Sequence, residues 1–287
     1  MYTRILVATG GSPWSDAAVA YAIALATHIR AELCILTVLN VSGVYATPDV
    51  MTSSELLMES VEQQGQDLLA HATARATDAG VPHVAILKWG NVTETVLQTA
   101  AEEQCDLIVL GSRGLSGFKR LMLGSISNAV TAKAQCPVLV IKQPPPASLS
   151  WRRVLVATGG SPWSDAAVDH ALELARVQQL DVCLLYVEQH RPRRTDSLFG
   201  LTSDAKNVLA LAEARAAAAG VPYEAKLARG DVTTMILETA TQQQCDVIIL
   251  GSRGLTGFKR LMLGSISNAV AATAPLPVLI VKRFLLT

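Results

Sequence analysis

Two long stretches of the chain occur twice, and this duplication constrains the fold more than any other feature. The segment LVATGGSPWSDAAV at 6–19 returns unchanged at 155–168. The segment LGSRGLSGFKRLMLGSISNAV at 110–130 returns at 250–270 with a single substitution. The period is about half of the 287 residues, far longer than the repeats of solenoid proteins. The sequence therefore predicts two copies of one domain.

The segment QPPPASLS at 143–150 separates the two copies. Three consecutive prolines followed by small polar residues cannot continue a helix or a central strand. We expect a linker at 143–150 between a first domain at 1–142 and a second at 151–287. Each domain has roughly 140 residues, enough to bury most of a sheet that is covered on both faces.

Each copy alternates short apolar runs with segments of helical spacing. In the first copy we expect a helix after the first strand, helices at 52–79 and 92–103, and another from about Ser125. The expected strands are at 4–9, 32–38, 83–88, 106–110 and 137–142, and in the second copy at 152–158, 181–187, 223–228, 246–250 and 277–282. Apolar strands separated by helices are typical of a parallel sheet between helical layers. We predict an α/β fold with two doubly wound five-stranded parallel-sheet domains, each with the strand order 3-2-1-4-5.

In such a sheet, ligands bind beyond the carboxyl ends of the strands, where the strand order reverses. Here that point lies between strands one and four. The two most strictly repeated segments, GGSPWSD and GSRGLSGFKRLMLGS, follow those same strands, whereas other loops of the two copies share no likeness. We therefore expect both repeated loops to line one crevice in each domain.

The second of these loops suits phosphate. A glycine at a strand end permits close approach of a ligand to the backbone, and Ser125 opens a helix whose first N–H groups attract anions. Arg113, Lys119 and Arg120 add positive charge, and no carboxylate occurs from residue 107 to 164. A tight turn followed by a serine cap also explains these residues, so a phosphate site and a purely structural turn both stay open at this point.

The composition excludes several classes of function. The 24 basic and 24 acidic residues balance, so no net field attracts nucleic acid or an anionic membrane. The apolar stretch AAVAYAIALATHI is too short to span a membrane, and MYTRILVATGG does not resemble a signal peptide. Five cysteines without a CxxC spacing favour buried thiols in a reducing compartment. We expect a cytoplasmic protein that binds neither nucleic acid nor membrane.

The spacing Gly-x-x-Gly, nine residues, then Gly-Ser resembles the phosphate-loop signature of the ATP-binding universal stress proteins. Both copies match this signature, at Gly111, Gly114, Gly124 and Ser125 and at Gly251, Gly254, Gly264 and Ser265. The resemblance covers nearly the whole chain, and tandem members with two such domains are known. It implies an adenine nucleotide alpha-hydrolase-like fold, a loop that holds phosphates and ribose, and fifth strands that pair two domains back to back.

The resemblance also implies which residues bind nucleotide, including Val38 and Val187, whose backbone at the end of strand two would meet the adenine. In the first copy these residues are Ala8, Thr9, Gly10, Gly11, Ser12, Val38, Gly111, Ser112, Arg113, Gly114, Gly124, Ser125, Ile126 and Ser127. In the second copy they are Ala157, Thr158, Gly159, Gly160, Ser161, Val187, Gly251, Ser252, Arg253, Gly254, Gly264, Ser265, Ile266 and Ser267. The expected cofactor is ATP or a related adenine nucleotide, with or without Mg²⁺.

The chain departs from the family in one place. The first strand of the family usually ends in Asp-Gly-Ser, with the aspartate beside the nucleotide, whereas both copies here have a glycine instead, Gly10 and Gly159. The loss of one polar contact costs about 1–3 kcal/mol. We expect weaker binding, a different pose or a preference for another nucleotide.

Other residues near the crevice have two interpretations each. Trp14 and Trp163 either stack on a base or, as we favour, pack the loop. Asp16 and Asp165 suit the first turn of a helix, and Mg²⁺ binding is the less favoured alternative. The histidines show no metal spacing, and no Ser-His-Asp or Cys-His set can be assembled. We therefore assign no catalytic and no metal-ligating residue.

Three functions fit the sequence. We favour a stress-response regulator or sensor in which an adenine nucleotide biases conformation or the binding of a regulatory protein partner. A slow ATPase or phosphotransferase is an alternative, although efficient transfer needs a metal-holding acid and a group that positions the nucleophile. An interaction scaffold without nucleotide is the third. We expect the PVLVIK and PVLIVK edges to form an internal pseudo-dimer, and homo-oligomers beyond it.

Overall fold

The computed structural model describes residues 2–40, 54–113, 123–189, 203–253 and 263–283. Of the expected site residues, Gly114 and Gly254 lie outside these ranges, as do Lys119 and Arg120. The chain divides into two compact units, Tyr2–Leu149 and Ser150–Thr287. This division falls at the end of the segment 143–150 that we expect to link the domains.

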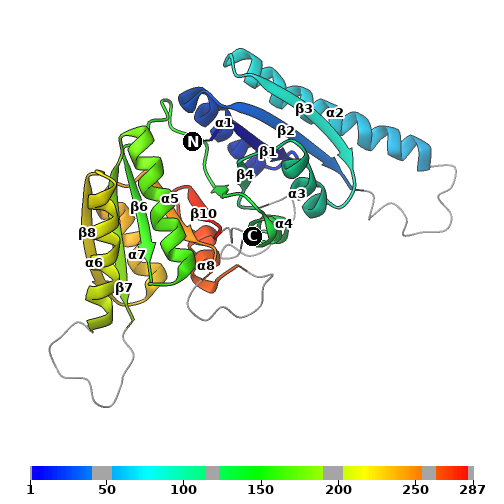
Figure 1. Ribbon diagram of the computed structural model, residues 1–287. Coiled ribbons are helices and arrows are strands. Elements are labelled where there is room, and N and C mark those ends of the chain that lie inside the picture. Colours follow the sequence, from blue (N-terminus) through cyan, green and yellow to red (C-terminus); the bar gives the residue numbers. More distant parts are fainter. Residues whose placement is uncertain (1, 41–53, 114–122, 190–202, 254–262, 284–287) are drawn as a thin grey trace. The chain divides into compact units, whose positions relative to one another are not determined.

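In its described residues, the first unit contains one parallel sheet with helices on both faces (Figure 1). Its elements are β1 (Arg4–Thr9), α1 (Pro13–Ile29), β2 (Glu32–Leu39), α2 (Ser54–Asp78), β3 (His83–Trp89), α3 (Val92–Glu102), β4 (Leu107–Gly111), α4 (Ser125–Lys133) and β5 (Val138–Ile141). The strand order is β3-β2-β1-β4-β5. The predicted doubly wound α/β fold is therefore confirmed for this unit.

The second unit repeats this architecture. Its described elements are β6 (Arg153–Thr158), α5 (Pro162–Gln178), β7 (Asp181–Glu188), α6 (Ser203–Ala218), β8 (Tyr223–Arg229), α7 (Val232–Gln242), β9 (Val247–Gly251), α8 (Ser265–Thr273) and β10 (Val278–Val281). The strands are parallel in the order β8-β7-β6-β9-β10. The strand order that the sequence predicts is confirmed here as well.

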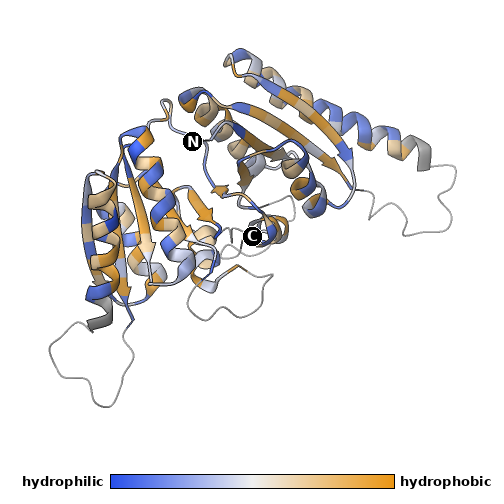
Figure 2. Cartoon of the chain, in the orientation of Figure 1, coloured by the Kyte–Doolittle hydropathy of each residue, from blue (hydrophilic) through white to orange (hydrophobic). Residues whose placement is uncertain are grey.

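The central strands form the core of each unit. Ile5, Leu6 and Val7 of β1 have no exposed surface, and neither do Val154, Leu155 and Val156 at the matching positions of β6. Figure 2 shows the strands as the most continuously hydrophobic elements of the chain. A parallel strand is covered on both faces, so its residues are apolar without alternation.

The first helix of each unit begins immediately after the central strand. In the first unit, Ser12 and Ser15 form a reciprocal cap, in which the Ser15 N–H donates to Ser12 Oγ over 3.1 Å and the Ser12 N–H donates to Ser15 Oγ over 2.9 Å. Pro13 at the first helical position has the φ that a helix requires. The turn into the cap uses Gly11, whose φ is +71°. These residues fix the loop at the carboxyl end of β1.

Where element boundaries differ from the predicted ones, they differ by one or two residues. The fourth strand, expected at 106–110, is Leu107–Gly111. Asp106 stands outside it because its carboxylate accepts hydrogen bonds from the N–H groups of Thr3, at 2.7 Å, and Arg4, at 3.2 Å. No helix within the described ranges combines the length and the apolar composition needed to cross a lipid bilayer.

Candidate functional site

The two repeated loops of the first unit meet at the carboxyl ends of β1 and β4, which pair directly. The Ser12 hydroxyl lies 3.5 Å from the carbonyl oxygen of Arg113. The N–H of Gly124 donates to the carbonyl of Ser112 over 2.9 Å. The structure therefore brings together the predicted residues at 10–12, 111–113 and 124–127, at the carboxyl ends of the two strands where the strand order reverses.

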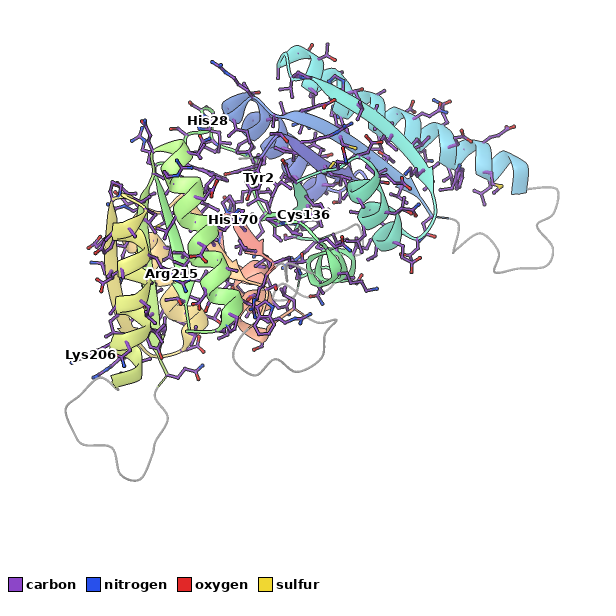
Figure 3. The ribbon with its side chains drawn as sticks, in the orientation of Figure 1. Tyr2, His28, Cys136, His170, Lys206 and Arg215 are labelled. Atoms are coloured by element: carbon purple, nitrogen blue, oxygen red, sulfur yellow. The ribbon has the colours of Figure 1, made fainter. Side chains whose placement is uncertain are left out.

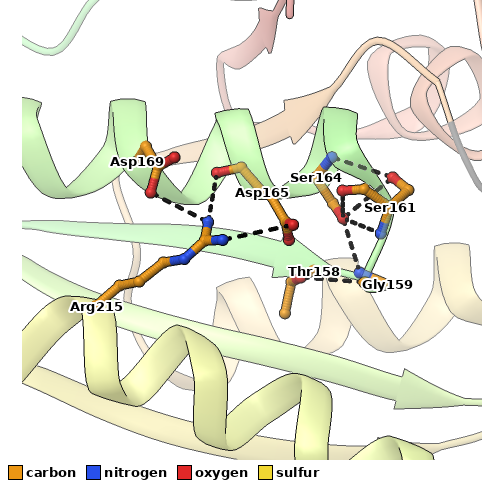
Figure 4. A network of polar contacts seen from close by, with 8 residues as sticks. Thr158, Gly159, Ser161, Ser164, Asp165, Asp169 and Arg215 are labelled. Carbon is orange, nitrogen blue, oxygen red and sulfur yellow. Dashed lines mark hydrogen bonds and ion pairs between the residues drawn. The ribbon is translucent and has the colours of Figure 1, made fainter.

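The same arrangement recurs in the second unit. The N–H of Gly264 donates to the carbonyl of Ser252, again over 2.9 Å. Ser161 and Ser164 form the cap of α5, with the same 3.1 Å and 2.9 Å contacts that cap α1 (Figure 4). Among the described residues, the serine cap and the bond that joins the two ends of the glycine segment therefore have the same geometry in both units.

The start of α4 has no side-chain cap among the described residues, and the same is true of α8. Two other helices of the first unit are capped: Ser12 caps α1, and Asn91 caps α3 by accepting from the Glu94 N–H. Gly124 and Gly264, which precede α4 and α8, provide only backbone. A helix start without a side-chain cap offers its first N–H groups to an anion.

The glycines of the site serve different purposes. A Cβ on Gly111 would lie 2.5 Å from the backbone oxygen of Trp14, so the close approach of α1 to β4 requires glycine there. Gly251 and Trp163 repeat this contact at the same distance. Around Gly10, in contrast, no atom of the described residues lies within 4 Å of the added Cβ. Open space therefore exists where the family usually has its aspartate.

The serines also divide into two groups. The Ser127 hydroxyl donates to the carbonyl of Gly111 over 2.6 Å, and Ser267 donates to Gly251 over 2.7 Å. These buried hydroxyls attach α4 and α8 to the preceding strands, although we expected them to be donors to a ligand. Ser125 is exposed at the helix start. The Ser112 hydroxyl is buried, with 1% exposure, and has no hydrogen-bond partner within the described part of the chain.

An arginine follows the strand in each loop and covers a tryptophan. The guanidinium of Arg113 lies 5.7 Å from the ring centroid of Trp14, and that of Arg253 lies 5.6 Å from Trp163. Both distances fit a cation–π contact. The indoles therefore pack against the loop, which agrees with the interpretation that we favoured over base stacking.

Sequence reasoning missed Lys142, which directly follows β5. The Ser112 N–H donates to the carbonyl of Ile141 over 2.8 Å, so Lys142 follows a residue that is bonded to the glycine loop. Burial and the nearby charge of Arg113 lower the pKa of Lys142 to about 8. A second positive group close to Arg113 favours an anion at this end of the sheet. The sequence carried one signal for a role of Lys142: a lysine ends both PVLVIK and PVLIVK.

The remaining predicted residues lie at strand ends and in the first turns of helices. Ala8 and Thr9 end β1, and Val38 is the penultimate residue of β2. Ala157 and Thr158 end β6, and Val187 is the penultimate residue of β7. Ile126 and Ile266 lie in the first turns of α4 and α8. Their contacts with a nucleotide stay a prediction.

Among the described residues, the second unit has an ion-pair network that has no counterpart in the first. The Arg215 guanidinium of α6 lies 3.5 Å from a carboxylate oxygen of Asp165 and 3.1 Å from one of Asp169 (Figures 3 and 4). In the first unit, Ala20 occupies the position of Asp169, so this network cannot form there. Within the described ranges, no group of three or more His, Cys, Asp or Glu side chains could hold a metal ion.

The model of the universal stress protein family matches residues 1–142 and 150–282. The chain belongs to the universal stress protein family. It is a tandem member, because the family model matches it twice. A universal stress protein of Mycolicibacterium smegmatis is 28% identical over 289 residues, which span 97% of this chain and 96% of that protein.

Other relatives of this universal stress protein have either one copy or two. The universal stress protein YxiE of Bacillus subtilis is 34% identical over 150 residues, which are 50% of this chain and 100% of that protein. The crystal structure of a universal stress protein from Archaeoglobus fulgidus covers 98% of both chains, with a TM-score of 0.78 and 23% identity. That likeness shows the fold.

Proposed function

We propose that this universal stress protein binds ATP or a related adenine nucleotide in each domain and acts as a stress-response regulator or sensor. One observation carries the proposal: α4 and α8 each begin beside a glycine loop without a side-chain cap. The other short helices that follow a strand, α3 and α7, are capped by Asn91 and Asp231. The two starts without a cap therefore stand out as phosphate-binding positions.

The surroundings of α4 suit a polyphosphate. The N–H groups of the first turn and the Ser125 hydroxyl can donate to phosphate oxygens, and Arg113 and Lys142 supply positive charge. Charge-assisted bonds of this kind are roughly twice as strong as neutral ones. Arg253 and Ser265 repeat these groups in the second domain, so we propose two nucleotides per chain.

Binding and regulation fit the site better than catalysis. Phosphoryl transfer needs an acid that holds the metal and a group that positions the nucleophile. Gly10 and Gly159 stand where the family has a carboxylate, and the Asp165 carboxylate pairs with Arg215. A slow ATPase would release phosphate, and this release would disappear in a variant that cannot bind nucleotide. The proposed output is instead a change in affinity for a regulatory protein or for a second chain.

Calorimetric titration of the full chain with ATP tests the proposal. The variant Gly124→Ala together with Gly264→Ala places a methyl group at both helix starts. The φ angles at these positions are −56° and −59°, which alanine adopts without strain. We therefore expect normal folding and a loss in affinity of about 100-fold, or roughly 2.7 kcal/mol, because the methyl groups obstruct the phosphate.

Each single glycine variant should retain one of the two nucleotides. The matched control is Lys133→Ala at the exposed carboxyl end of α4, which should bind two nucleotides as the unaltered chain does. If the unaltered chain binds no ATP, ADP or AMP at millimolar concentration, the proposal is wrong and the nucleotide-free scaffold is correct.

A further inference from the structure

Each domain has a lysine directly after its fifth strand. Lys142 follows β5 and Lys282 follows β10, and both side chains are half-buried. The strand residues before the lysine have changed between the copies, from PVLVIK to PVLIVK, while the lysine is retained. Because sheets of this kind bind ligands at the carboxyl ends of their strands, the two lysines are placed where a ligand can meet them.

The pairing of β4 with β5 places Lys142 beside the glycine loop. Gly111 at the end of β4 is in register with Ile141 at the end of β5. The pairing continues one residue further, because the Ser112 N–H donates to the carbonyl of Ile141 over 2.8 Å. Ser112 and Lys142 are therefore the next residues of two neighbouring strands, which lie about 5 Å apart.

Ser112 and Lys142 belong to the face of the sheet on which α4 lies. The crossovers from β1 to β2 and from β4 to β5 run in opposite directions, so their right-handedness puts α1 and α4 on opposite faces. A Cβ on Gly111 would lie 2.5 Å from the backbone oxygen of Trp14, so position 111 faces α1. Successive strand residues alternate between the faces, and the next position on each strand therefore faces α4.

The start of α4 is attached to the same strand end. The Gly124 N–H donates to the carbonyl of Ser112 over 2.9 Å, and the Ser127 hydroxyl donates to the carbonyl of Gly111 over 2.6 Å. The first N–H groups of α4, which has no side-chain cap, attract an anion. The Ser112 hydroxyl is 1% exposed and has no partner among the described residues, so a phosphate bound at this helix start would give it an acceptor.

The second domain repeats these contacts. The Ser252 N–H donates to the carbonyl of Val281 over 2.9 Å, and the Gly264 N–H donates to the carbonyl of Ser252 over 2.9 Å. Lys282, which follows Val281, therefore stands beside the start of α8 as Lys142 stands beside the start of α4.

The strand order decides which part of a nucleotide can reach the lysine. The order is β1-β4-β5, so the strand ends where the order reverses, those of β1 and β4, lie on one side of the glycine loop and Lys142 lies on the other. The open space at Gly10 is on the side of β1. A nucleoside on that side, with its first phosphate at the start of α4, directs its further phosphates toward β5 and Lys142.

We propose, on the basis of the nucleotide site proposed above, that Lys142 and Lys282 bind the outer phosphates of a nucleoside polyphosphate and make both sites select di- and triphosphates over monophosphates. The ammonium adds a charge-assisted hydrogen bond to a second or third phosphate. A monophosphate held by the helix start ends before the lysine and gains nothing from it. In the first domain, a phosphate beside Lys142 also offsets the repulsion from Arg113 that lowers the pKa of this lysine.

Calorimetric titration of the full chain with ATP, ADP and AMP tests this selectivity. We expect the unaltered chain to bind ATP and ADP about tenfold more tightly than AMP. The variant Lys142→Met together with Lys282→Met removes both ammonium groups and keeps side chains of similar length. It should lose about tenfold in affinity for ATP and ADP and bind AMP as before. Lys142→Arg together with Lys282→Arg keeps the charges and should retain the preference for ATP.

The matched control is Lys133→Met, which removes a positive charge from the exposed carboxyl end of α4 and should leave all three affinities unchanged. Two results would overturn the selectivity: an equal loss of ATP and AMP affinity in the folded double methionine variant, or an unchanged preference for ATP. If that variant does not fold, Lys142→Gln together with Lys282→Gln gives the same measurement.

Inorganic tripolyphosphate separates this proposal from the nucleotide site on which it rests. The unaltered chain should bind tripolyphosphate, and the double methionine variant should bind it about tenfold more weakly. Binding of tripolyphosphate that depends on the lysines, without binding of any nucleotide, would overturn the nucleotide function and support the lysine site. Binding of nucleotide and tripolyphosphate that is independent of the lysines would overturn the lysine site alone, and binding of neither would overturn both.

Discussion

The two domains are most alike in the loops that follow the central strands, and their first helices diverge after about two turns. α1 and α5 have identical sequences from the proline at the first position to Val19 and Val168. At the next two positions, α1 has Ala20 and Tyr21, whereas α5 has Asp169 and His170. The identical turns are those that pack against the glycine strand end. The duplicated loops therefore retain the residues that shape the site, while the bodies of the helices have adapted to different neighbours.

The largest expected effect tests whether the packing of the first helix against the glycine strand end requires glycine in both domains. Gly111→Ala and Gly251→Ala each place a methyl group 2.5 Å from a backbone oxygen, which cannot move without shifting the start of α1 or α5. Overpacking of this severity costs about 3 kcal/mol. We expect each variant to lower the free energy of unfolding of its own domain by that amount in urea.

Hydrogen exchange of peptides from α1 and α5 assigns the loss to a domain. Gly10→Ala is the matched control, because its Cβ meets nothing within 4 Å and its φ is not positive. Its free energy of unfolding should stay within about 0.5 kcal/mol of the unaltered chain. An equal loss in Gly10→Ala and Gly111→Ala would show that the packing against Trp14 is not the cause.

A second prediction distinguishes the two domains by the dependence of their stability on pH. Burial lowers the pKa of His170 from 6.5 to about 4, against the opposing charge of Glu173. Between these values the unfolded chain binds a proton that the folded domain does not, so stability decreases as the pH falls from about 6.5 toward 4. The full shift corresponds to about 3 kcal/mol.

The first domain has Tyr21, a phenol in place of the imidazole, at this position. We therefore expect the second domain to lose stability first on acidification. Hydrogen exchange at several pH values measures the stability of each domain. His170→Tyr copies the first domain and should remove most of the difference. If the two domains lose stability in parallel in both proteins, His170 does not control the acid response.

The sequence predicted the fold because its signals were local and repeated. The apolar strand RILVAT matches β1 at both ends, and Ser125 begins α4 as expected. It also predicted which loops meet, since the loops that follow neighbouring parallel strands lie at the same edge of the sheet. What it could not predict were side-chain partners across the chain. Gly111 looked like a place for a ligand, yet Trp14 approaches it, and the Ser127 hydroxyl bonds to backbone.

Two features of the site were hidden for the same reason. Lys142 is separated from Arg113 by a helix and a strand, and the pairing of β4 with β5, which sets Gly111 in register with Ile141, brings their segments together. Arg215 and Asp169 are 46 residues apart, and nothing in either segment indicates the ion pair. Contacts between distant segments depend on rotamers and register, which a repeat in the sequence does not specify.

A third prediction concerns the departure from the family. Gly10→Asp places a carboxylate in open space, so the fold should accept it. If the proposed nucleotide site is correct, the added acceptor should tighten nucleotide binding in the first domain by about tenfold, or roughly 1.4 kcal/mol. Titration of Gly10→Asp in a Gly264→Ala background isolates that domain. Gly10→Asn keeps the shape without the charge, and weaker binding in both variants would contradict the prediction.

The smallest expected effect tests the network that only the second domain has. Arg215 and Asp169 are 38% and 65% exposed at the side chain, so water screens their attraction and the pair contributes about 0.5 kcal/mol. Asp169→Ala copies the first domain and should lower the unfolding free energy of the second by that amount at low salt.

Ala20→Asp makes the reverse change in the first domain, where Arg75 stands at the position of Arg215. A gain of similar size that disappears at high salt would show that the first domain retains the framework for the pair and lacks only the carboxylate. No gain would mean that α2 and α6 present their arginines differently.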